Sequence, residues 1–122
     1  MFSIVFYEDK NGKSELYEEL IELTQKSITS KDARIQLKQI TYCLELLQRN
    51  GCKLPETISK HIKNDIYELR PGNNRILYFY FTNNEFVLLH MFRKKSKKTP
   101  MTEIEKAERK RDDFLVRNGG LE

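Results

Sequence analysis

The sequence predicts an α+β domain, in which an antiparallel sheet of about four strands follows a helical hairpin and precedes a single helix. Three observations lead to this prediction. Residues 13–49 carry the apolar spacing of two amphipathic helices, residues 66–93 hold β-prone runs separated by two turn signals, and residues 99–116 carry a third helical pattern. With 122 residues, of which 39% are hydrophobic and 33% charged, the chain is expected to form one highly soluble domain over residues 1–122.

A first strand and a first helix are expected before residue 30. Residues 2–7 are rich in β-prone side chains and end at the turn-forming sequence Asp9-Lys10-Asn11-Gly12. From about Lys13 to Ser27 apolar residues recur at helical spacing, while glutamates cover the other side. The apolar stripe consists of Leu16, Leu20 and Leu23, and the outer side consists of Glu15, Glu18, Glu19 and Glu22.

Asp32 to Arg49 is the clearest helical segment of the sequence. Its apolar residues keep a 4-3-4-3 spacing and are Ala33, Leu37, Ile40, Leu44 and Leu47. Asn50-Gly51 supplies the C-terminal stop. The two helices should form an αα-hairpin whose apolar face covers the sheet, so this stripe is interpreted as core and not as a cofactor site.

Residues 52–65 are expected to form an irregular surface loop, because Leu54-Pro55 and Asn64-Asp65 favour turns. His61 falls in this loop without a visible partner. We interpret it as a solvated side chain, and a catalytic role is the less favoured alternative.

Residues 66–93 are expected to form three strands joined by two tight turns. Gly72-Asn73 and Asn83-Asn84 are strong hairpin signals, because Gly and Asn tolerate the positive φ angles of primed turns. The first turn places Arg70 opposite Arg75. The second places Arg75 opposite Phe92, Leu77 opposite His90, and Thr82 opposite Glu85.

One face of this sheet is therefore expected to gather charged residues, because facing residues share a side of a sheet. One row holds Arg70, Arg75 and Phe92, and the next holds Glu68, Leu77 and His90. Ile66, Phe79, Leu88, Phe81 and Phe86 would continue the same face. Since two arginines directly opposite each other repel, an anion is expected between them. It is either the structural carboxylate of Glu68 or a bound phosphate, whose oxygens match guanidinium groups.

Positive charge accumulates just after these strands. The formal net charge is +4, and residues 61–122 hold 13 basic and 9 acidic side chains, which accounts for the whole excess. Five of the six residues from Arg93 to Lys98 are basic, and Lys94 should point the same way as Phe92. Such a run is often only a solvated segment. Here it leaves the strand end where two arginines converge, which favours a polyanionic partner such as nucleic acid.

A last helix is expected from about residue 100 to Val116. Thr99 can cap it with Pro100 at its first position, and Thr102 with Glu105 form an alternative capping box. Its apolar side consists of Ile104, Ala107, Phe114 and Leu115, and Asn118-Gly119-Gly120 should end it.

The cysteines and the hydropathy pattern indicate a cytoplasmic protein. Cys43 and Cys52 form no CxxC motif and have no histidine at metal-ligand spacing, so both are expected to be reduced. No signal peptide or membrane span is predicted, because the N-terminus soon becomes acidic and the apolar runs are short. No metal or cofactor is expected.

The hairpin region also resembles a known family. IYELRPGNNRILYFYF and VLLHMFRKKSKKTPMTEIEKA are similar to the phage-derived, HigB-like branch of the RelE/ParE superfamily of bacterial toxins. The shared elements are a Glu-Leu-Arg ending one strand, an Arg opening the next, an aromatic run, Leu-His-x-Phe-x-Lys-Lys, and Lys-Thr-Pro before a helix. The similarity is strongest over about residues 64–110.

This resemblance implies a RelE-like fold and a ribosome-dependent endoribonuclease that cuts mRNA, inhibits translation and acts in the cytoplasm. It also implies neutralisation by a helix-turn-helix, HigA-like antitoxin, with operator DNA contacted only through that antitoxin, and no membrane partner. The family's functional arginines and lysines correspond here to Arg70, Arg75 and Lys94, with Lys95 beside them.

A mechanism follows as a hypothesis. Arg70 and Arg75 would clamp the scissile phosphate, and Lys94 or Lys95 would add charge and could transfer a proton. Glu68 would orient an arginine or act as the base. His90 is an alternative proton carrier, although a buried strand histidine satisfied by a neighbour is the more favoured interpretation. The expected RNA-binding residues are Phe92, which would stack a base, with Arg93, Lys97 and Lys98.

Two other functions stay open from the sequence. One is a non-enzymatic, ParE-like toxin that inhibits a DNA topoisomerase. The other is a basic nucleic-acid-binding module without toxicity.

Overall fold

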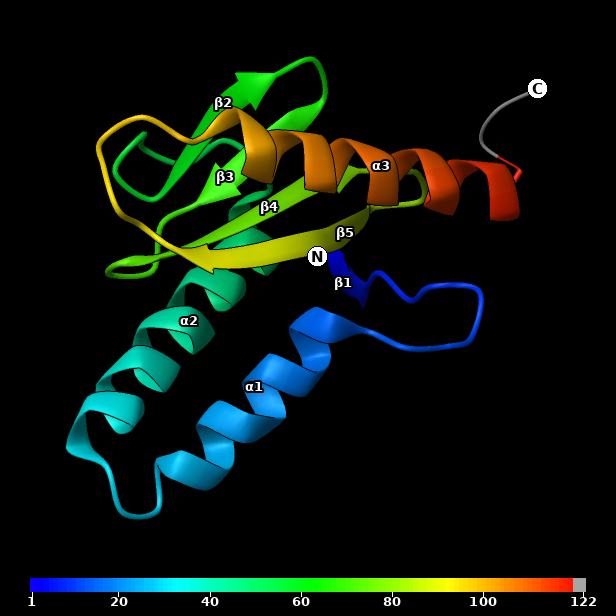
Figure 1. The fold of residues 1–122 in the computed structure, drawn as a ribbon. Helices are drawn as coiled ribbons and strands as arrows, with labels where there is room; N and C mark the ends of the chain where they lie inside the picture. The colour runs from blue at the N-terminus through cyan, green and yellow to red at the C-terminus, as the bar shows by residue number, and fades with distance from the viewer. Residues whose placement is uncertain (120–122) are drawn as a thin grey trace.

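The helices and strands form three layers, with a central sheet between a helical hairpin and a single helix (Figure 1). The computed structural model describes residues 1–119. The elements in chain order are β1 (Ser3–Phe6), α1 (Glu15–Lys26), α2 (Lys31–Asn50), β2 (Ser59–Lys63), β3 (Ile66–Leu69), β4 (Asn74–Tyr80), β5 (Glu85–Arg93) and α3 (Met101–Arg117). The predicted α+β class and the order of its helices are confirmed. The C-terminal Gly120 of the predicted helix stop lies outside the described residues.

The sheet has five strands in the order β1-β5-β4-β3-β2, one more than expected. It is also mixed, because β1 pairs in parallel with β5 while the other neighbours are antiparallel. The prediction of an irregular segment over residues 52–65 was wrong for Ser59–Lys63, which forms the edge strand β2. This strand is short and mostly polar, with exposed Lys60 and Lys63. Edge strands often carry charged residues, and such a composition gives no apolar alternation to detect.

Each face of the sheet has its own core. On one face, α1 and α2 pack through Leu16, Ile40, Cys43 and Leu47 against Leu69, Ile76, Tyr78, Phe86 and Leu88. On the other face, α3 packs through Ala107 and Phe114 against Ile66, Leu77, Phe79, Val87 and Leu89. The helical hairpin therefore covers the sheet as predicted, and the charged corner described below lies on the α3 face.

The helix ends follow local capping chemistry. The hydroxyls of Ser14 and Ser30 accept hydrogen bonds from Tyr17 N and Ala33 N at the starts of α1 and α2, both at 3.1 Å. Gly51 ends α2 with a φ of 64°. The expected capping of α3 by a side chain was wrong, because its N-cap is Pro100 and no side chain of the described residues caps it.

The predicted strand register holds near the first turn and fails beyond a β-bulge. Glu68 pairs with Leu77, Arg75 with Phe92, and Leu77 with His90, as expected. The next pair is Tyr78 with Leu88, so the ladder between β4 and β5 skips Leu89. Because Leu89 has no partner in β4, the residues of β5 before it point to the opposite side of the sheet from the one predicted. Leu88 and Phe86 therefore lie in the core under α1 and α2, contrary to the prediction, and Val87 and Leu89 replace them under α3.

No helix within residues 1–119 combines the length and the apolarity that crossing a membrane requires. Cys43 is buried and Cys52 exposed, and both thiols are free.

Candidate functional site

The sheet brings the two predicted arginines to one corner. Arg70 directly follows β3, Arg75 lies in β4, and the antiparallel register of these strands places the two residues opposite each other. Arg75 in turn pairs with Phe92 of β5. The row expected from the first turn signal is therefore present.

The carboxylate of Glu68 lies between these arginines. Its Oε2 accepts a hydrogen bond from Arg70 Nε at 3.0 Å and forms an ion pair with Arg75 Nε at 3.8 Å. Its Oε1 accepts a hydrogen bond from the hydroxyl of Thr99 at 2.6 Å. Only 2% of the Glu68 side chain is exposed. The structural carboxylate, one of the two anions that the sequence left open, is therefore in place.

The guanidinium groups also bind backbone carbonyls. Arg70 Nη1 donates to Glu56 O at 3.1 Å, and Arg75 Nη1 donates to the carbonyls of Gly72 and Asn74, both at 2.8 Å. Burial, which disfavours the charged form, lowers the pKa of Arg75, while Glu68 opposes this shift and Arg70 adds to it. Since an arginine pKa starts so high, Arg75 stays protonated at neutral pH. One carboxylate shared by two guanidinium groups leaves an excess of one positive charge.

The loop that joins β5 to α3 adds more positive charge. Lys94 N donates to Asn73 O at 2.8 Å, which extends the strand pairing by one residue, and the Thr99 hydroxyl fastens the other end of the loop to Glu68. Lys94, Lys95, Lys97 and Lys98 are exposed, and within residues 1–119 none of them forms an ion pair. We call these four lysines, together with Arg70 and Arg75, the basic corner.

A small hollow lies within the basic corner. Its lining consists of Glu68, Arg75, Phe92, Lys94, Lys95, Ser96, Lys97, Lys98, Thr99 and Pro100. Apart from Glu68, whose oxygens already have partners, the charged groups of this lining are cationic. The arrangement suits an anion with several acceptor oxygens, such as a phosphate.

Helix α2 supports the turn between the two arginines from the other side of the sheet. Asn74 is 3% exposed, and its side-chain amide donates to Gln36 Oε1 at 3.1 Å. Gly72 has a φ of 60°, and the end of the Gln39 side chain lies so close that any Cβ at this position would displace it. The turn that carries the carbonyl partners of Arg75 is thus held by two glutamines of α2.

His90 lies outside this hollow. Its Nε2 forms a hydrogen bond with Glu103 Oε1 of α3 at 2.9 Å, and its ring stacks on Phe92 with centroids 5.8 Å apart. It lines a different hollow, together with Tyr7, Glu15, Lys106, Arg109 and Lys110. Burial lowers the pKa of His90, and the hydrogen bond with Glu103 opposes this shift. The arrangement matches the interpretation as a buried histidine satisfied by a neighbour.

Of the four predicted RNA-binding residues, three line the hollow and the fourth lies on the opposite face of the sheet. Phe92, Lys97 and Lys98 line the hollow of the basic corner. Arg93 pairs with Asn74 and is exposed, and strand alternation directs it to the face opposite Phe92. No sequence signal pointed to the bond between Thr99 and Glu68, because the two residues are 31 positions apart and Thr99 fitted a helix cap.

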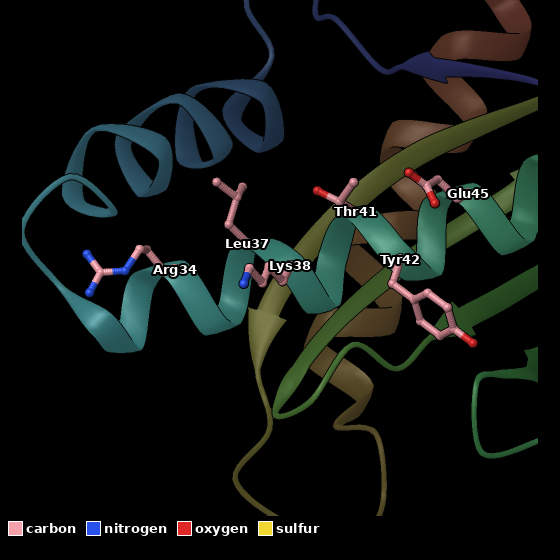
Figure 2. Close-up of a pocket in the computed structure, with 6 residues that line it drawn as sticks. All are labelled: Arg34, Leu37, Lys38, Thr41, Tyr42 and Glu45. Carbon is pink, nitrogen blue, oxygen red and sulfur yellow. The ribbon is translucent and has the colours of Figure 1, made fainter.

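A further hollow lies along α2, away from the basic corner. It is lined by Arg34, Leu37, Lys38, Thr41, Tyr42 and Glu45. Figure 2 shows Tyr42 directed away from Leu37 and Thr41 on the outside of the helix. Its lining mixes apolar residues with charges of both signs, which suits a protein contact better than an anion.

Comparisons with known proteins agree with this architecture. The family model described as "Phage derived protein Gp49-like (DUF891)" matches residues 26–112, which include the whole basic corner. No curated protein sequence matches the chain.

Among solved structures, the chain is similar to YoeB in the YoeB–YefM complex from Staphylococcus aureus, with 18% identity and a TM-score of 0.52 over 72% of this chain and 91% of that one. The YoeB dimer from the same organism gives 18% identity and a TM-score of 0.50, over 71% of this chain and 90% of that one. The heterotetrameric YoeB–YefM toxin–antitoxin complex, also from Staphylococcus aureus, gives 19% identity and a TM-score of 0.50, over 72% of this chain and 91% of that one. These likenesses confirm the predicted RelE-like fold.

We predict that Glu68→Gln lowers the free energy of unfolding by on the order of 2–3 kcal/mol, because it leaves two partly buried guanidinium groups without a counter-charge. Urea denaturation measures the effect. Glu105→Gln, which removes an exposed carboxylate of α3, is the matched control and should change stability little. Equal stability of the two variants would show that the Glu68 carboxylate does not hold the corner together.

A second prediction concerns His90. Because its pKa is lower in the folded protein than in the unfolded chain, His90 contributes stability above the ordinary histidine pKa of about 6.5, and this contribution is lost as the pH falls through the folded-state value. The free energy of unfolding should therefore decrease as the pH falls from about 7.5 to about 5.5. His90→Gln should flatten this pH dependence. Val116→Gln, which changes an exposed residue of α3 that does not titrate, should keep the wild-type slope. An unchanged slope in His90→Gln would contradict the assignment.

Proposed function

The chain belongs to the phage-derived Gp49-like family, and from this membership, its YoeB-like fold and its basic corner we propose that it is the toxin of a toxin–antitoxin system. Its activity in this proposal is endonucleolytic cleavage of mRNA on the ribosome, which arrests translation in the cytoplasm. The observation that carries the proposal is the hollow that Arg75 and four lysines line together with a single carboxylate, which already binds Arg70, Arg75 and Thr99.

The scissile phosphate of the mRNA would bind over the mouth of this small hollow, among the lysine side chains that line it. The 2′-hydroxyl loses its proton to water and its oxygen forms a bond to phosphorus, while the bond from phosphorus to the 5′-oxygen breaks and the 5′-oxygen takes a proton from Lys94 or Lys95. Negative charge builds up on the phosphoryl oxygens in the transition state, and Arg75 and Lys94, which line the hollow, would stabilise it. Lys95, Lys97 and Lys98 would add to the positive field.

Glu68 acts in this proposal as a positioning residue. Its two oxygens already bind Arg70, Arg75 and Thr99 and its side chain is buried, which disfavours removal of a proton from the substrate by this carboxylate. Its role is to fix the directions of both guanidinium groups and to hold the end of the lysine-rich loop against the sheet. His90 has a structural role, because it is bonded to Glu103 and lines a separate hollow.

The lining of the hollow supports the proposed dependence on the ribosome. Free-standing ribonucleases usually bring a histidine or carboxylate pair to the reacting atoms as acid and base. Within residues 1–119 the only such group lining this hollow is Glu68, whose oxygens are already engaged. The ribosome would orient the mRNA so that the 2′-oxygen is in line, and cationic stabilisation would supply the rest of the acceleration.

The partner in this proposal is a helix-turn-helix antitoxin that contacts operator DNA. Two surfaces suit it: the basic corner, which would take an acidic segment, and the outer side of α1 and α2, which exposes apolar residues. The latter are Tyr17, Ile21, Ile35 and Tyr42, which are 42–58% exposed. Two of the similar structures are complexes of YoeB with YefM, which supports a dedicated antitoxin here as well.

We predict that Arg75→Ala and Lys94→Ala each slow mRNA cleavage in a translating extract by about a hundredfold, because each removes a cation from the charge that develops on the phosphoryl group. Lys94 is exposed, so its variant should fold normally, and a thermal melt checks this. Lys31→Ala, an exposed lysine at the start of α2, is the control and should cleave at the wild-type rate.

The extract assay, together with measurements of growth and of topoisomerase activity, separates the nuclease from the two alternative functions. Wild-type cleavage should disappear when ribosomes are removed from the extract. Growth arrest without mRNA cleavage, accompanied by inhibition of a DNA topoisomerase, would establish the ParE-like alternative. Overproduction without growth arrest would leave a plain nucleic-acid-binding module, and full activity of both Arg75→Ala and Lys94→Ala would overturn the role of the basic corner.

We also predict that co-expression with a helix-turn-helix protein encoded beside this gene abolishes growth arrest and yields a stable complex. Tyr42→Ser with Ile35→Ser should weaken the complex if the antitoxin covers α2, whereas Lys97→Glu with Lys98→Glu should weaken it if the antitoxin covers the basic corner. Size-exclusion chromatography of the purified mixture measures complex formation. Recovery of only the free protein would refute the partnership.

A further inference from the structure

Strand β2 adds a second row of positive charge beside the basic corner. In the ladder with β3, Lys60 is opposite Glu68 and Lys63 is opposite Ile66. Glu68 lies in the basic corner and Ile66 in the core under α3, so both lysines belong to the α3 face of the sheet. Both are exposed.

A groove lies between β2 and the lysine-rich loop. Its cationic lining consists of Lys60, Lys63, Arg70, Lys97 and Lys98, and its apolar lining includes Ile62, Met101 and Ile104. We call it the β2 groove. Figure 1 shows how this arises, because the loop after β5 crosses toward β2 before α3 begins.

The β2 groove adjoins the hollow of the basic corner. Lys97, Lys98 and Thr99 line both, while Arg75 lines the hollow and Arg70 lines the groove. Thr99 donates a hydrogen bond to Glu68, which lines the hollow, at 2.6 Å. The two arginines that share Glu68 therefore line two neighbouring cavities, and Lys97 and Lys98 supply cations to both.

The lining suits a flexible polyanion with apolar parts. Within residues 1–119 a single carboxylate pairs with a lysine of the groove, Glu108 with Lys63 at 3.7 Å, so most of the positive charge is available. Met101 is 53% exposed and offers an apolar surface between the cations. A single RNA strand presents a regular series of phosphates with bases and riboses between them, and charged grooves with apolar contacts are typical of proteins that bind single strands.

We propose that an RNA strand whose phosphate binds over the hollow at Arg75 continues past Lys97 and Lys98 into the β2 groove, where Lys60 and Lys63 bind a neighbouring phosphate. This inference rests on the proposed function and assigns to the protein itself a second phosphate site next to the one where cleavage would occur. Since Lys60 and Lys63 line the β2 groove and not the hollow lined by Arg75, they would hold the strand and take no part in the reaction.

The test measures binding of a 2′-O-methyl oligoribonucleotide, which the enzyme cannot cleave, at several salt concentrations. Lys60→Ala with Lys63→Ala should weaken binding about tenfold at low salt and reduce the slope of log affinity against log salt by about 0.7 for each phosphate that is no longer neutralised. Lys60→Arg with Lys63→Arg should bind like the wild type. Lys10→Ala with Lys31→Ala, which removes two exposed lysines outside both cavities, is the matched control.

A gain of affinity offers an independent test. Glu108→Gln removes the carboxylate that pairs with Lys63, so it should strengthen RNA binding by a factor of a few and have no effect when Lys63 is already alanine. Thermal melts of all variants confirm that the fold is kept, which is expected because Lys60 and Lys63 are exposed.

The outcomes separate this inference from the proposed function. If Lys60→Ala with Lys63→Ala keeps the wild-type affinity and salt slope while Lys94→Ala loses both, the second phosphate site is refuted and the nuclease proposal is kept. If the wild type cleaves mRNA on ribosomes but binds no free oligoribonucleotide, the inference also fails. If a polyglutamate peptide of equal charge binds the groove as tightly as RNA, the groove is an acidic-peptide site and the RNA assignment is overturned.

Discussion

The corner of the molecule depends on one buried carboxylate shared by two guanidinium groups and a hydroxyl. Glu68 joins Arg70 at the end of β3, Arg75 in β4 and Thr99 before α3, so three separate stretches of the chain meet at its two oxygens. Without it, the ladder would bring two positive charges directly opposite each other. With it, the same ladder holds two guanidinium groups in fixed directions at a site that still has surplus positive charge, as phosphate binding requires.

This arrangement also explains why both layers of helices matter for the site. The α3 layer contributes Thr99 through the loop that precedes the helix, and α2 contributes Gln36 and Gln39, which contact the turn from the opposite face. The carbonyls of Gly72 and Asn74, which orient Arg75, therefore depend on packing on both sides of the sheet.

The sequence was sufficient for the parts of the fold that local chemistry determines. The stripes of α1 and α2 predicted the helical hairpin, and the Gly72-Asn73 turn predicted the register that places Arg70 opposite Arg75. The bulge at Leu89 was not predictable, because one extra residue in an apolar run leaves no mark in the pattern and yet moves Phe86 and Leu88 to the other face. Strand β2 was missed for the opposite reason, since an edge strand of mostly polar residues is held by its backbone pairing with β3 and not by apolar alternation.

The contacts of His90 have a direct consequence for the chemistry of the site. His90 pairs with Leu77 on the α3 face, as the predicted register required, and there it bonds to Glu103 of α3. The bulge at Leu89 changes only the residues before His90, and His90 lines a different hollow from the one lined by Arg75 and the lysines. What lines that hollow is positive charge that can hold and stabilise a phosphate, without an acid–base pair among the described residues to start the reaction alone. In the proposed function, cleavage therefore depends on how the RNA is presented, and so on the ribosome that presents it.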